Sequence, residues 1–70
     1  MATIFQESIV AEDGLHVRAI VTENEGLYSV DVQEYHDGQW QSIDPQSDGD
    51  EPQPNKALAI ANAKRWLNSY

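Results

Sequence analysis

The stretch that decides the fold spans residues 14–38 and reads GLHVRAIVTENEGLYSVDVQEYHDG. Three glycines, Gly14, Gly26 and Gly38, recur in it at intervals of twelve residues, and each follows an acidic residue. Glycine supplies the positive φ that tight hairpin turns require, and Asp-Gly between alternating runs is typical of a hairpin. The spacing therefore predicts an antiparallel meander with turns at these three positions.

The segments between the glycines alternate apolar and polar side chains. In residues 15–23 the odd positions up to Val21 are apolar, and in residues 27–35 the even positions from Tyr28 to Val32 are apolar. A period of two directs one face of a sheet to a core and the other to water. A first strand at 3–10 and a short fourth strand at 39–43 extend the meander. We expect Tyr28 and Trp40 among the large core side chains.

The composition changes at residue 44. Residues 44–54 contain all three prolines of the chain and four carboxylates, which predicts a loop. Asn55 is a suitable N-cap, and residues 55–68 are rich in Ala and Leu, which predicts a helix. Its apolar side chains fall within one arc of about 120°. Ala59 and Ala63 in this arc would let the helix approach the sheet closely, with Trp66 as a third large core side chain.

The predicted fold class is α+β, a three- to four-stranded antiparallel meander with one C-terminal helix packed on one face. At 70 residues the chain has room for a single domain, with a sheet at 3–43, an acidic proline-rich loop at 44–54 and a helix at 55–68. It has no cysteine, no signal-peptide pattern and no apolar run of the roughly 18 residues that a membrane span needs. We therefore expect a soluble cytoplasmic protein.

The charges are unevenly distributed along the chain. Twelve acids against four bases give a net charge of −8. Residues 1–54 hold all twelve acids and a single base, Arg18, whereas residues 55–70 hold Lys56, Lys64 and Arg65 and no acid. A surface of this kind repels phosphates, which disfavours direct binding to nucleic acid or to anionic membranes. A basic protein surface is the expected partner.

Other chemistries find little support in the sequence. His16 and His36 lie on different predicted elements, so we assign no metal site. The start of a calcium-binding loop is resembled by Asp44, Gln46, Asp48 and Gly49, but Asn55 stands where the bidentate glutamate belongs. No nucleophile motif surrounds any serine, and so short a chain has little volume for a pocket. We therefore expect no catalytic residues, no cofactor and no enzyme activity.

The acidic residues form the candidate partner-binding surface, with Tyr35 as its apolar anchor. They come from two neighbouring turns, the strand between them and the proline-rich loop: Glu23, Glu25, Asp31, Glu34, Asp37, Asp44, Asp48, Asp50 and Glu51. We expect Tyr35 to share the outer face of the sheet with Ile20, Leu27 and Ile43. Carboxylates held on a rigid sheet can imitate phosphates and occupy a groove lined with Lys and Arg.

The size, the lack of cysteine, the acidic meander from 23 to 51 and the closing AKRWL helix at 63–67 together resemble the small acidic inhibitors that phages and mobile elements encode. These inhibitors include anti-CRISPR proteins and DNA mimics. The resemblance is one of type, spread over the whole chain. It implies a non-catalytic inhibitor that occupies the nucleic-acid-binding groove of a nucleoprotein defence complex, such as a CRISPR effector complex, in a bacterial host cell.

Three alternatives remain open at this level. The chain could be a small structural or homo-oligomeric module, for instance a homodimer, joined through the apolar outer residues or open sheet edges. It could be a regulatory protein that depends on a small ligand or a metal. The acidity itself could serve solubility or a high-salt habitat instead of binding.

Overall fold

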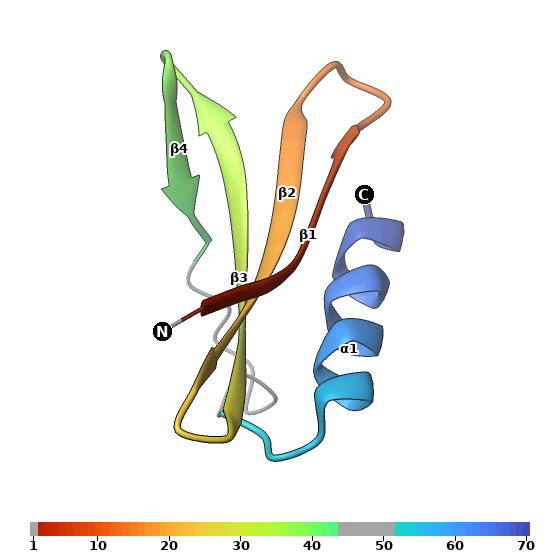
Figure 1. The fold of residues 1–70 in the computed structure, drawn as a ribbon. Coiled ribbons are helices and arrows are strands. Elements are labelled where there is room, and N and C mark those ends of the chain that lie inside the picture. The colour runs from red at the N-terminus through yellow and green to blue at the C-terminus, as the bar shows by residue number, and fades with distance from the viewer. Residues whose placement is uncertain (1, 44–51) are drawn as a thin grey trace.

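The computed structural model describes residues 2–43 and 52–70 of the chain, and in them four strands form one antiparallel sheet. The elements are β1 (Ala2–Val10), β2 (His16–Asn24), β3 (Leu27–His36), β4 (Gln39–Ser42) and α1 (Lys56–Asn68). The strands follow one another across the sheet in the order β1-β2-β3-β4, and α1 lies along one face (Figure 1). The prediction of an α+β meander with one C-terminal helix on one face is confirmed.

Two of the three predicted turns are tight two-residue hairpins. Glu25 and Gly26 join β2 to β3 with φ of 54° and 80°, and Asp37 and Gly38 join β3 to β4 with φ of 52° and 80°. Two consecutive residues with positive φ give the type I′ turn, whose twist matches that of the flanking strands. The turns therefore set the register, pairing Asn24 with Leu27 and His36 with Gln39.

The first strand contains a β-bulge, which explains its weak alternation. Thr3 pairs with Thr22 and Phe5 pairs with Val21, so Ile4 is an extra residue without a partner in β2. A bulge lets two successive side chains turn towards the same side of a sheet. Ile4 and Phe5 accordingly both pack against the core.

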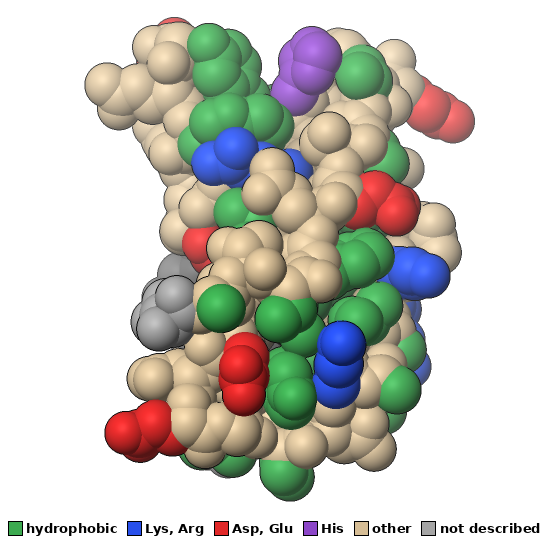
Figure 2. Space-filling model, viewed as in Figure 1, with side chains coloured by type: hydrophobic (Ala, Val, Ile, Leu, Met, Phe, Trp, Pro, Cys, Tyr) green, Lys and Arg blue, Asp and Glu red, His purple; other side chains and the backbone are tan. Residues whose placement is uncertain are grey.

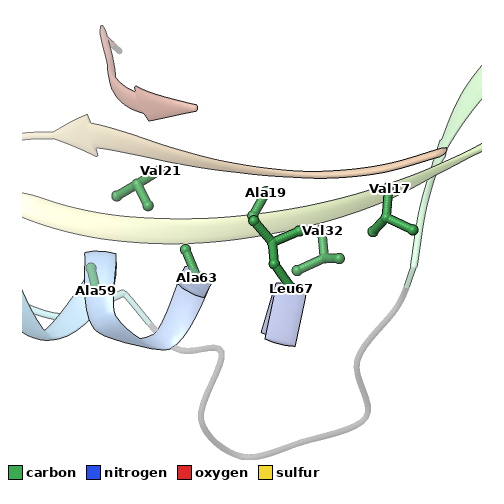
Figure 3. Packing of buried hydrophobic residues seen from close by; sticks show 7 residues of the cluster. All are labelled: Val17, Ala19, Val21, Val32, Ala59, Ala63 and Leu67. Atoms are coloured by element: carbon green, nitrogen blue, oxygen red, sulfur yellow. The ribbon is translucent and has the colours of Figure 1, made fainter. Parts of the chain in front are cut away.

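The core lies between α1 and the inner face of the sheet (Figure 3). The sheet contributes small and β-branched side chains and the helix contributes mainly alanine; the buried set is Val17, Ala19, Val21, Val32, Ala59, Ala63 and Leu67. The two alanines face the sheet as the helical arc predicts. Small side chains on both surfaces allow the helix backbone to lie close to the strands.

This thin core corrects the expectation that three large aromatic residues fill it. The largest fully buried side chains are the valines of β2 and β3. Tyr28 and Trp66 are half-buried at the margin of the core. Trp40 pairs with Tyr35 on the outer face, away from α1, and Ile43, which we expected outside, packs against the core. The prediction for these two side chains is wrong because it exchanges the faces of β4.

The helix begins where its N-cap was predicted. The side chain of Asn55 accepts a hydrogen bond from the backbone N–H of Leu58 at 3.1 Å. Just before it, Gln53 pairs with Tyr28 at the start of β3 through two backbone hydrogen bonds, of 2.7 and 2.9 Å. The chain is thus tied to the sheet immediately before α1, which positions the helix over β2 and β3.

Replacing a core alanine of α1 by a larger residue tests the close approach of helix and sheet. Ala63→Leu should lower the free energy of unfolding by about 1–3 kcal/mol, because the added side chain has no room beneath the helix. Ala61→Leu is the matched control, since Ala61 is exposed on the same helix and leucine has nearly the same helix propensity. Equal urea midpoints for the two variants would contradict this packing.

Candidate protein-binding surface

The outer face of the sheet, opposite α1, is the candidate binding surface. Strand pairing places Arg18 opposite Gln33, Ile20 opposite Asp31, and Tyr35 opposite Trp40 on this face. Within residues 2–43 and 52–70, no helix or strand packs over it (Figure 1). The face combines aromatic rings with an arginine, and aromatic and arginine side chains are enriched at surfaces that contact a partner.

Three aromatic rings cross the outer face from β2 to β4. The rings of Tyr35 and Trp40 are 5.2 Å apart at 66°, and those of His16 and Tyr35 are 6.4 Å apart at 71°. Both pairs have the edge-to-face geometry that aromatic side chains prefer. We call His16, Tyr35 and Trp40 the aromatic row. Figure 2 shows a histidine, a basic side chain and hydrophobic side chains gathered at the upper end of the molecule.

Arg18, the one basic residue of the sheet, lies beside this row. Its guanidinium carbon lies 4.2 Å from the centre of the Trp40 ring, within the range of a cation–π interaction. Its Nε donates to Oε1 of Gln33 at 2.6 Å, and Nε2 of Gln33 donates to Oδ2 of Asp31 at 2.7 Å. The hydroxyl of Ser42 donates to the same oxygen at 3.3 Å. These contacts connect β2, β3 and β4 and restrain the side chains around the aromatic row.

The structure divides the acidic residues that the sequence grouped together. Asp31 lies on the outer face and Asp37 in the β3–β4 turn, next to the aromatic row. Glu25 lies in the β2–β3 turn at the opposite end of the sheet, and Glu23 pairs with Tyr28 on the helix side near that end. In the view of Figure 2 the acidic side chains are well separated. Asp44, Asp48, Asp50 and Glu51 lie outside the described residues.

Glu34 lies on the helix side of the sheet, which corrects its expected place on the outer surface. It pairs with the core residue Val17, so its side chain shares the face that α1 covers. Its Oε2 accepts a hydrogen bond from the hydroxyl of Tyr70 at 2.8 Å, and its Oε1 lies 2.8 Å from Nε2 of His36. Glu34 therefore links the end of the chain beyond α1 to β3.

The Glu34 contacts shift two pKa values in opposite directions. Hydrogen bonds from His36 and Tyr70 lower the pKa of Glu34 below its ordinary value of 4.5. Partial burial and the neighbouring Glu34 carboxylate raise the pKa of Tyr70 to about 12. Asp13, in the β1–β2 turn, is close enough to oppose the lowering at Glu34. The β1–β2 and β3–β4 turns therefore bring carboxylates to the same end of the sheet (Figure 1).

Sequence reasoning missed Trp40, Arg18 and His16 as members of the outer surface, although signals for all three exist. A two-residue turn at 37–38 pairs residue 35 with residue 40, so Trp40 must share the face of Tyr35. Arg18 is the single base among the first 54 residues, and its even position places it with His16 opposite the apolar stripe of β2. The same parity argument places Glu34 with Val32 on the inner face.

Several other findings bear on function. Among the described residues, no group of three or more His, Cys, Asp or Glu side chains could hold a metal ion. None of the helices in the described part of the chain is long and apolar enough to cross a membrane. A scan against protein-family models, a search of curated proteins and a search of solved structures found no match.

The Glu34–Tyr70 bond predicts a specific loss of stability at high pH. The pKa of Tyr70 is higher in the folded state than in the unfolded state, where it is about 10, so this phenol contributes stability below pH 10. The contribution disappears as the pH rises towards 12. Tyr70→Phe should therefore lose less free energy of unfolding between pH 10 and pH 12 than the wild type does. Tyr35→Phe, on the opposite face, is the control and should behave like the wild type. Urea titrations across this range measure the difference, and identical slopes for all three proteins would contradict the assignment.

Proposed function

We propose that this protein acts by binding, without catalysis, to a basic protein surface that otherwise holds nucleic acid. The observation that carries the proposal is the excess of carboxylates in the sheet and its turns. Between described residues the one ion pair joins Glu34 to His36, and it is an ion pair only when the histidine is protonated. The remaining carboxylates of the described sheet form no salt bridge with a described Lys or Arg, and the exposed ones among them are available to a cationic partner.

The geometry supports one end of the sheet as the docking end. At this end the outer face presents Tyr35 and the adjoining turn presents Asp37, while Asp31 lies nearer the middle of the face. The β1–β2 turn adds Glu12 and Asp13 at the same end (Figure 1). Rigid carboxylates around an aromatic row give a partner both electrostatic attraction and an apolar contact at the centre. Because the acids lie on more than one face, a single groove would contact this end and leave Glu23 and Glu25 outside it.

The kind of partner is inferred from chemistry and from the resemblance of type. A groove lined with Lys and Arg that accepts phosphates also accepts a rigid array of carboxylates. The proposed role is therefore inhibition of a nucleic-acid-binding protein, such as a CRISPR effector complex met by a phage or mobile element. The attraction should be fast and sensitive to salt, because it acts between exposed charges.

Self-association through the outer face has less support. The apolar set expected there loses Ile43 to the core, and Leu27 lies at the far end of β3 from Tyr35. The middle of the face carries Arg18, Gln33 and Asp31, whose polar groups hydrogen-bond to one another. Burying this network against a second copy would remove its contact with water for little apolar gain.

Capture from a nuclease-treated bacterial lysate tests the proposal. The immobilised protein should retain a basic nucleic-acid-binding protein that elutes with rising salt and competes with its own nucleic acid. Asp31→Asn/Asp37→Asn should weaken the captured complex about tenfold, mainly through slower association. Glu23→Gln/Glu25→Gln removes the same charge at the other end and is the matched control. The proposal fails if the immobilised protein retains no basic protein beyond what an inert bait retains. It also fails if the affinity of the captured complex changes neither with salt nor in either double variant.

A further inference from the structure

Tyr35 and Trp40 form an aromatic corner on the outer face. Their rings meet at 66° with centres 5.2 Å apart, and Tyr35 remains 41% exposed. In this edge-to-face pair the exposed part of the Tyr35 ring remains open to a cation beside Trp40, and aromatic π-faces of this kind bind alkylammonium and guanidinium groups. The hydrogen bonds and ring contacts described above hold the corner in place from three strands.

One guanidinium already uses this surface. Arg18 stacks on Trp40 at 4.2 Å, whereas no described Lys or Arg stacks on Tyr35. The exposed Tyr35 ring is therefore the member of the corner that lacks a cation. The indole and phenol rings both carry the negative π-face that attracts a cation, and their neighbouring position would allow a second guanidinium to lie beside the first.

The charges around the corner favour an incoming cation. Gln33 connects Arg18 to Asp31, so the one base of the outer face has an acid close by. The two turns at this end of the sheet add the exposed carboxylates of Glu12, Asp13 and Asp37. A cation that approaches Tyr35 thus meets more negative than positive charge, in spite of Arg18.

We infer that Tyr35 and Trp40 receive an arginine side chain of the partner, and that this contact is the anchor of the interface. The inference rests on the proposed function for the partner's basic character and adds the residue type that it presents. Arginine fits better than lysine because its planar, weakly hydrated guanidinium stacks on aromatic rings and can hydrogen-bond a nearby carboxylate such as Asp37 at the same time. The ammonium of lysine acts mainly as a point charge.

Two short peptides of equal charge test this inference without the natural partner. They are identical except that one carries three arginines and the other three lysines, and each is titrated into ¹⁵N-labelled protein at low and at physiological salt. The arginine peptide should bind several-fold more tightly and shift the indole N–H signal of Trp40 and the amide of Tyr35. The indole N–H of Trp66, on the helix side, is an internal reference and should stay in place.

Substitutions at Tyr35 complete the test. Tyr35→Leu should weaken the arginine peptide about fivefold, the size of an exposed cation–π contact, whereas Tyr35→Phe keeps the ring and should retain the affinity. Urea titrations confirm that both variants fold. Equal affinity for the two peptides, or no effect of Tyr35→Leu, would overturn the inference. If a captured basic protein binds Tyr35→Leu as well as the wild type, the proposed function stands and the arginine anchor is wrong. If the arginine peptide binds but no lysate protein is captured, the arginine contact stands and the proposed function is wrong.

Discussion

The contact between α1 and the inner face of the sheet is the constraint on which the rest of this structure depends. It is made by alanines of the helix and by valines of β2 and β3, all almost completely buried. A chain of 70 residues buries only about 60% of its unfolded surface. A core this small must be closely packed to stabilise the fold. Close packing here means short side chains on both surfaces. Large aromatic residues are therefore held at the margin or on the outer face.

This constraint also explains the character of the outer face. Trp40 faces away from the helix, because the turn at 37–38 pairs it with Tyr35, and it is stabilised there by its edge-to-face contact with Tyr35 and by the guanidinium of Arg18. The chain of hydrogen bonds from Arg18 through Gln33 to Asp31 satisfies polar groups that water would otherwise solvate. No helix or strand in the described part of the chain covers the outer face, and an open face with aromatic side chains suits recognition of another surface.

The acidic residues have different roles according to their position. Glu34 is structural, because it joins β3 to Tyr70 and gains hydrogen bonds that favour its ionised form. Asp31 is partly structural, since two side chains donate to it. Asp37 and Glu25 occupy turn positions with positive φ, where short or polar residues are tolerated, and their carboxylates point to solvent at opposite ends of the sheet. Charge alone does not separate these roles, but the contacts of each carboxylate do.

Most of the fold could be predicted from local sequence signals. The acidic residue–glycine pairs at 25–26 and 37–38 determine type I′ turns, the alternation in β2 and β3 determines the inner face, and Asn55 with the alanine-rich segment determines the start and buried face of α1. The register of the turns and the alternation along each strand also predict that Trp40 faces outward and Glu34 inward. What only the tertiary structure decided is which distant groups meet. Tyr70 meets Glu34 because of how far α1 extends along the sheet, and Arg18 of β2 meets Trp40 of β4 across β3. Turns and periodicity act over a few residues, whereas these contacts depend on the twist of the whole sheet and on where the helix ends along it, which no local pattern encodes.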